Sequence, residues 1–246
     1  MKGKDIVGAL MAIFGGVLAL RGFLTMETTL INLGIAGMLL GGVVITFKSS
    51  ECTKRDSVKL ILEAYEDALR RMCENLYLEG NAIFIPPYEN LPKGGLFVPL
   101  HRDFELDLAR FDEKIVFLTD VPKDSAMGLF LGPFGGELVD KFEEHLEGPL
   151  EGVGSVESAG GAVLKALGLA SRVYIEESRD YYMVIVKPEV ECDHDNLTKV
   201  PCPIISAILL GLSKATGELL TIEGAEEKEH GIELRVKKLG GAEEWM

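Results

Sequence analysis

With 39 acidic and 25 basic residues among 246, the chain carries a net charge of −14 at neutral pH. That charge excludes nucleic acid as an expected partner, because the phosphates of DNA or RNA would be repelled. The four cysteines, at positions 52, 73, 192 and 202, are too few and too far apart for the disulfide framework of a small secreted protein. Hydrophobic residues make up an ordinary 47%, so a membrane segment has to be recognised by its position and not by composition.

Two apolar runs open the chain, at residues 6–24 and 28–47, and each is long enough to cross a hydrocarbon core of about 30 Å. Arg21 lies near the end of the first run, where a long basic side chain can reach the lipid headgroups. A cleaved signal peptide is the alternative for this run, but no small-x-small cleavage site follows Leu20. We therefore expect residues 1–50 to form a transmembrane hairpin, which makes the protein a multi-pass protein of the cell membrane.

The charges that flank the hairpin predict its orientation. Basic residues lie at both outer ends, namely Lys2, Lys4, Lys48, Lys54 and Arg55. The short loop between the spans offers only Arg21, which Glu27 offsets. By the positive-inside rule both termini are expected in the cytoplasm.

Small residues recur on both predicted spans. Gly8, Ala12 and Gly16 follow one another every four residues, and Gly37 and Gly41 form a GxxxG motif. Such residues let helices approach closely in lipid. They predict pairing of the two spans, or a homo-oligomer that forms through Gly37 and Gly41.

Residues 51–80 are expected to contain a linker and an amphipathic helix that begins near Asp56 and is closed by Gly80. Residues 81–240 are expected to form a cytoplasmic α+β domain, with an internal boundary near residue 150 as an option. Short apolar runs predict strands at residues 82–85, 96–100, 115–118 and 127–131, and a helix follows the glycine-rich turn at 132–136. The tail at 241–246 is expected to be loose.

The second half of this domain begins with a glycine- and serine-rich stretch, residues 148–161, which is expected to be a connection before a short helix that ends near Leu167. Strands are predicted at 172–176, 181–187, 218–223 and 231–237, and an apolar helix at 203–215. This order favours an α+β fold with a largely antiparallel sheet. The helix at 203–215 is apolar on nearly all sides, so we expect it to be buried at the centre of the domain. Its residues Ile205, Leu209 and Leu212, with Cys202, are the candidate surface for an apolar ligand or a protein partner.

Residues that could carry chemistry are few. Cys192, His194 and Cys202 are of the types that zinc prefers, but their spacing offers three ligands at best. They could also supply a Cys–His nucleophile pair. His101 follows an apolar strand and could act as a general base, although no triad partner is recognisable. The glycine-rich stretches lack the residues of a phosphate-binding loop, so no cofactor or metal is expected.

Two resemblances add to this interpretation. The stretches at 82–86, 96–100, 128–133 and 203–212 are similar to an uncharacterised family of archaeal membrane proteins with a transmembrane hairpin and a soluble domain, for which no activity is implied. Residues 155–238 resemble a vinyl-reductase-type small-molecule-binding domain, on the basis of Pro201-Cys202-Pro203, Gly211, Gly217, Glu223 and Gly231. That resemblance implies an apolar ligand or a protein partner. The cysteines usual near the final turn are absent from residues 225–229.

We therefore expect a membrane-anchored binding or sensory module rather than an enzyme. One alternative is a membrane-anchored enzyme that uses His101 or the group of Cys192, His194 and Cys202. The other is a structural membrane protein that oligomerises through its hairpin.

Overall fold

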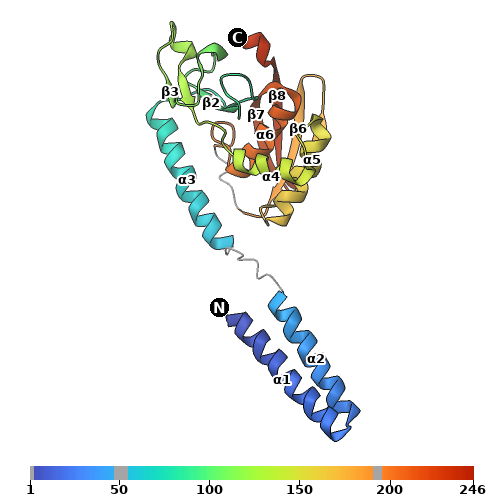
Figure 1. Cartoon of the computed structure of the whole chain (residues 1–246). Helices are drawn as coiled ribbons and strands as arrows, with labels where there is room; N and C mark the ends of the chain where they lie inside the picture. Colours follow the sequence, from blue (N-terminus) through green and yellow to red (C-terminus); the bar gives the residue numbers. More distant parts are fainter. Residues whose placement is uncertain (1–2, 47–54, 191–195) are drawn as a thin grey trace. The chain divides into compact units, whose positions relative to one another are not determined.

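The computed structural model describes residues 3–46, 55–190 and 196–246. The chain divides into two compact units, Met1–Lys54 and Arg55–Met246. The first unit contains the helices α1 (Gly3–Thr25) and α2 (Thr28–Thr46), and the second contains all the strands (Figure 1). Both α1 and α2 are long and apolar enough to cross a membrane.

Glycines bring α1 and α2 into backbone contact. The contact residues Gly8, Gly15 and Gly22 recur every seven positions on α1 and face the backbone or side chains of α2. A Cβ atom on Gly34 of α2 would lie 2.3 Å from the backbone nitrogen of Ala19, so only glycine fits there. The predicted stripe is therefore wrong at Gly16, since a Cβ atom there would meet only the Met38 sulfur, at 3.8 Å.

The second unit is built on one eight-stranded antiparallel sheet in the order β3-β4-β2-β1-β7-β8-β6-β5. The strands are β1 (Ile83–Ile85), β2 (Gly95–Pro99), β3 (Phe117–Leu118), β4 (Gly128–Phe130), β5 (Ala170–Glu177), β6 (Tyr181–Pro188), β7 (Glu218–Lys228) and β8 (Gly231–Gly241). Strands from both sides of residue 150 share this sheet. The predicted fold class, a hairpin followed by an α+β region with a largely antiparallel sheet, is confirmed.

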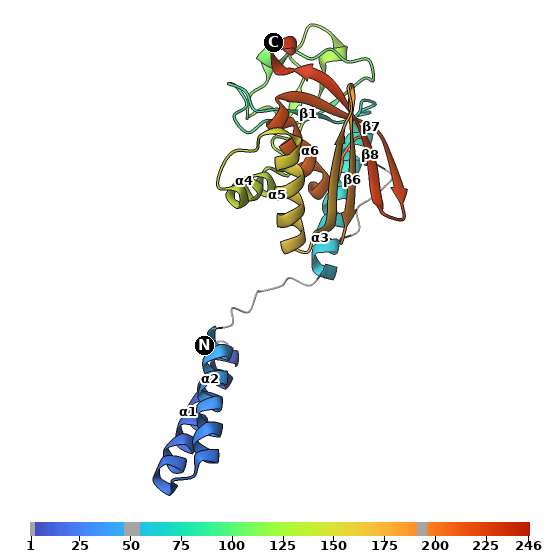
Figure 2. The same cartoon turned by 90° about the vertical axis from the view of Figure 1, so that its right-hand side faces the viewer.

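The described residues of the second unit also form four α-helices: α3 (Arg55–Asn75), α4 (Gly136–Leu146), α5 (Gly152–Ala166) and α6 (Pro203–Thr216). Figure 2 shows α4, α5 and α6 together on one face of the sheet. Every residue of α6 from Ile204 to Ser213 is buried, which confirms the prediction of a central helix. Gly135, with a φ of +86°, lets the turn before α4 approach the backbone of Ala207 on α6.

Each face of the sheet has its own hydrophobic core because side chains alternate along the strands. Phe84, Leu96 and Val98 face the helices and belong to the larger core. Ile83, Ile85, Phe97 and Leu219 face the other way and form a second core with Leu108 and Phe111, which come from the chain between β2 and β3. That stretch and the turn after it contain the short 3-10 helices Leu108–Arg110 and Asp124–Ala126. We call this second core the outer core, and it covers the half of the sheet that contains β1 to β4.

Several expected boundaries are wrong. The stretch that includes Gly152, Val153 and Gly154 is the first turn of α5 and not a connection, because Val156, Ala159 and Leu164 bury one side of that helix. The tail is not loose, since Ala242–Trp245 form a 3-10 helix. Helix α3 ends at Asn75 rather than near Gly80, and β7 and β8 extend to Lys228 and Gly241.

Candidate functional site

A polar pocket of about 480 Å³ lies on the sheet face opposite α6, where the outer core ends. We call it the sheet pocket. It is lined by Glu79, Asn81, Arg102, Phe104, Thr198, Lys199, Thr221, Glu223, Lys237 and Leu239. These residues come from five separate stretches of the sequence. A volume of this size falls within the range of small-molecule sites in proteins.

Strand register places the floor of the sheet pocket. Thr221 of β7 pairs with Lys237 of β8, so both side chains point to the same face. The Thr221 hydroxyl donates to the carbonyl of Ala82 (2.9 Å), and the Asn81 amide donates to the carbonyl of Ile222 (2.8 Å). These bonds hold the backbone before β1 against β7 at the floor of the pocket.

The aromatic wall of the sheet pocket depends on the end of the chain. Phe104 stacks on Trp245, with ring centroids 6.2 Å apart. The Trp245 indole N–H donates to the carbonyl of Leu239 (3.0 Å). The tail, which was expected to be loose, therefore holds Phe104 and Leu239, the two apolar residues that line this pocket.

The sheet pocket has a net positive charge, whereas the chain as a whole has a net charge of −14. Three cationic side chains line the pocket, against two carboxylates. Glu223 lies between Lys237 (3.4 Å) and Arg235 (3.5 Å), so its charge is compensated. Lys199 uses one donor on the carbonyl of Leu78 (2.8 Å), and its other two donors have no partner among the described residues. Within the described ranges, the Arg102 guanidinium and the Glu79 carboxylate make no hydrogen bond or ion pair.

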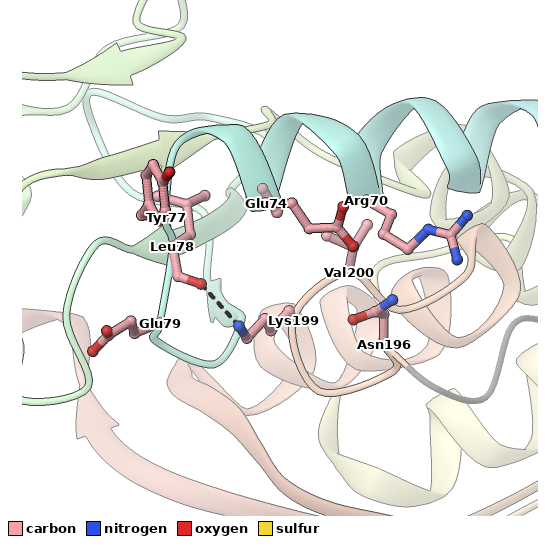
Figure 3. Close-up of a pocket in the computed structure, with 9 residues that line it drawn as sticks. Arg70, Glu74, Tyr77, Leu78, Glu79, Asn196, Lys199 and Val200 are labelled. Carbon is pink, nitrogen blue, oxygen red and sulfur yellow. Dashed lines mark hydrogen bonds between the residues drawn. The ribbon is translucent and has the colours of Figure 1, made fainter.

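A second cavity of about 270 Å³ adjoins the first at Glu79 and Lys199, and we call it the α3 pocket. Figure 3 shows Arg70, Glu74 and Tyr77 on one side of it and Asn196 and Lys199 on the other. Cys73 lines the same cavity and is 5% exposed. Burial raises the pKa of the Cys73 thiol, and nearby Lys199 opposes that shift only in part, so the thiol is held in its unreactive form.

The residues predicted to carry a function lie elsewhere. His101 is exposed at a bend after β2 and lines neither of these pockets. Ile205, Leu209 and Leu212 are fully buried in the larger core, and their role as a ligand surface stays a prediction.

The predicted cysteine–histidine group falls only in part within the described structure. Cys202 is buried at the N-terminus of α6 and is disulfide-bonded, so it has no free thiol to offer a metal or a substrate. Cys192 and His194 lie outside the described residues. Within the ranges that are described, no three His, Cys, Asp or Glu side chains gather as a metal site would require.

Residues 5–237 match the family described as "Domain of unknown function (DUF7982)". The chain belongs to this family. The DUF7982 match spans the hairpin and nearly all of the α+β region, so the two units belong together in the family. No curated protein and no solved structure matches the chain. The archaeal source and the vinyl-reductase-type resemblance stay predictions.

Proposed function

We propose that this DUF7982 member is a membrane-anchored binding module whose α+β domain takes a small molecule with an anionic group and an apolar part. The observation that carries the proposal is the Arg102 guanidinium beside Phe104 in the sheet pocket, which has no partner among the residues that the structure describes. A guanidinium fits a carboxylate or a phosphate by two parallel hydrogen bonds, and Lys199 can add a third donor. Phe104 and Leu239 offer contact to the apolar part of the ligand.

Trp245 makes this proposal directly testable, because it is the only tryptophan of the chain and stacks on a residue of the pocket. Purified full-length protein would be titrated with benzoate and phenyl phosphate, and with uncharged benzamide as the reference ligand. We expect a saturable change of Trp245 emission with the anions only. Arg102→Ala should weaken binding at least about tenfold, which is the loss of one charge-assisted pair.

The matched control is Arg172→Ala, since Arg172 is exposed on β5 and lines neither pocket. Unchanged emission with every anion, or equal affinities of wild type and Arg102→Ala, would contradict the proposal.

We also propose that both helices of the hairpin span the cell membrane and that both termini are cytoplasmic. The basic residues at the outer ends of the hairpin support this orientation. The disulfide of Cys202 argues the other way, because such bonds are rare in reducing compartments. A cysteine introduced at Thr25 should react with an impermeant thiol reagent added outside the cell, while one introduced after Gly240 should not. The reverse pattern would place the α+β domain outside.

A further inference from the structure

The Glu79 carboxylate differs from the other charged groups of the sheet pocket because the chain supplies no cation for it. Three cationic side chains line the same pocket, yet Glu79 forms an ion pair with none of them, and no other described residue donates to its carboxylate. Glu223, the second carboxylate of the pocket, is compensated by Lys237 at 3.4 Å and Arg235 at 3.5 Å. Glu79 is therefore available to a cationic group of a ligand.

The backbone holds Glu79 beside the stretch that contains Arg102. The Glu79 N–H donates to the carbonyl of Leu100 (2.9 Å), which lies two residues before Arg102. Figure 3 shows the Glu79 side chain turned away from Arg70 and Asn196, which line the other part of the α3 pocket. An anionic and a cationic side chain thus line the sheet pocket from neighbouring stretches of backbone without pairing with each other. A ligand that carries both charges can pair with both.

Two further oxygen atoms beside Glu79 suit a primary ammonium group. The Asn81 amide nitrogen donates to the carbonyl of Ile222 (2.8 Å), so the amide oxygen is left as an acceptor, and no described residue donates to it. The Thr198 carbonyl accepts from the Ala82 N–H (2.8 Å), which keeps the Thr198 hydroxyl next to Asn81. An ammonium group has three N–H donors. The carboxylate, the amide oxygen and the hydroxyl offer it one acceptor each.

The rest of the sheet pocket suits the other two parts of such a ligand. Arg102 and Lys199 can bind a carboxylate by charge-assisted hydrogen bonds. Phe104 and Leu239 supply apolar surface. An α-amino acid carries its ammonium group, its carboxylate and its side chain on one carbon atom. It therefore presents all three parts together to a pocket of about 480 Å³.

We propose that the ligand of the sheet pocket is a free α-amino acid with an apolar side chain, an inference that rests on the function proposed above. Its ammonium group binds Glu79, Asn81 and Thr198. Its carboxylate pairs with Arg102, and its side chain contacts Phe104. The head group of an ethanolamine lipid carries the same two charges, but it brings two acyl chains to a pocket in which only two of the ten lining residues are apolar.

The first test follows Trp245 emission of the full-length protein with three ligands of similar shape. L-phenylalanine has both charges, 3-phenylpropanoate lacks the ammonium group, and phenethylamine lacks the carboxylate. We expect phenylalanine to bind at least about tenfold more tightly than either of the others, which is the value of one hydrogen bond to a charged group. Equal affinities of phenylalanine and 3-phenylpropanoate would overturn this inference and leave the proposed anion site intact. Failure of both to bind would overturn the two proposals together.

The second test removes the charge of Glu79 and keeps its shape. Glu79→Gln should weaken phenylalanine at least about tenfold and leave the affinity for 3-phenylpropanoate unchanged or higher. Arg102→Ala should weaken both ligands. The matched control is Glu89→Gln, because Glu89 is exposed and lines neither pocket, and it should bind both as wild type does. Wild-type affinity for phenylalanine in Glu79→Gln, or an equal loss of both ligands, would overturn the inference.

The third test compares the free amino acid with a lipid of the same two charges. Dihexanoyl phosphatidylethanolamine, below the concentration at which it forms micelles, would compete with phenylalanine for the full-length protein. We expect it to bind more weakly than phenylalanine, and Glu79→Gln to leave its affinity unchanged. Tighter binding of the lipid than of phenylalanine would overturn the inference in favour of a lipid head group.

Discussion

The hairpin and the α+β domain both achieve close packing, but they use opposite residues to do so. Between α1 and α2 the contacts are made by glycines, and large side chains such as Phe14 (68% exposed) and Leu39 (67% exposed) point outward. In the α+β domain the large side chains are inside, and Phe84, Phe97 and Phe142 have no exposed surface. Large apolar side chains therefore face outward in the hairpin and inward in the α+β domain.

This difference follows from the solvent that each unit is suited to. In water, burial of apolar surface is favourable, so each large buried side chain adds to the stability of the domain. In lipid the outward side chains are already in an apolar medium, and helices associate by bringing their backbones close together. A glycine in the hairpin is therefore a contact residue, while most of the contact in the domain comes from leucine, isoleucine and phenylalanine.

The largest effect that this comparison predicts is at Leu209. Leu209→Asp would place an unpaired charge in the fully buried face of α6, which costs several kcal/mol. We expect the α+β domain to unfold, as measured by near-ultraviolet circular dichroism. Leu60→Asp makes the same change at an exposed position and should keep the wild-type melting temperature. A folded Leu209→Asp variant would show that α6 is not central.

The matching change in the hairpin adds one methyl group rather than a charge. Gly34→Ala would put a Cβ atom 2.3 Å from the Ala19 backbone nitrogen, so the two helices have to separate. Overpacking of this kind costs about 1–3 kcal/mol. The test uses a peptide of residues 1–54 with Cys52→Ser and pyrene labels at Leu10→Cys and Leu40→Cys. With Gly34→Ala this peptide should lose excimer emission at a lower SDS concentration than the same peptide with Gly34. Gly42→Ala is the control, because a Cβ atom there meets nothing within 4 Å, and it should behave as wild type.

A smaller effect is expected from the polar network at one end of the sheet. The Tyr182 hydroxyl donates to Glu218 Oε2 (2.7 Å), and Lys238 lies 4.2 Å from the centre of the Tyr182 ring. Burial, followed by the hydrogen bond to Glu218, raises the pKa of Tyr182 to about 12 from an ordinary value of 10.0. Because the unfolded chain ionises first, the stability contributed by this tyrosine is complete below pH 10 and is lost as the pH rises toward 12.

Tyr182→Phe should remove that part of the pH dependence, and it should lower the free energy of unfolding by about 1.5–3 kcal/mol at neutral pH, the value of a hydrogen bond to a charged group. Urea unfolding of the α+β domain at pH 8 and pH 11 would measure both quantities. If wild type and Tyr182→Phe lost the same free energy of unfolding between pH 8 and pH 11, this assignment would be contradicted.

The smallest effect is expected when the two units are separated. Each unit has its own internal contacts, and the division falls between Lys54 and Arg55. A fragment that begins near Asp56 should be soluble and should melt cooperatively, within about 2 °C of the α+β domain in the full chain. Persistent aggregation of the fragment would show that the domain needs the hairpin or the bilayer.

The sequence was sufficient wherever one strong local pattern decided the structure. Long uncharged runs predicted the two hairpin helices, and short apolar runs predicted the strands. Helix α5 began earlier than expected because its first half is rich in glycine and serine, which disfavour helices in isolation. Burial of Val156 and Ala159 overrides that preference, and such tertiary support is invisible in a single sequence.

The sheet pocket could not have been predicted from the sequence, for a different reason. Arg102, Lys199 and Lys237 are ordinary surface residues in their local contexts, and only the sheet order brings them together. The glycine-rich stretches are conspicuous in the sequence because each is a local pattern, yet neither lines the pocket. A search for cations spread along an otherwise acidic chain would have been the more useful signal.

The junction between β1 and β7 has a consequence for how the domain folds. Strands β5 to β8 and helices α5 and α6 all come from residues 152–241, so this half can form from contacts that are near in sequence. Within the sheet, the other half joins it through two residue pairs, Ile83 with Thr221 and Phe84 with Leu220. The sheet becomes continuous only when this short strand has found a partner far along the chain. In a pulse-labelling experiment the amides of β6 and β8 should therefore gain protection from hydrogen exchange before those of β1, and β1 should mark the border between two cooperative units.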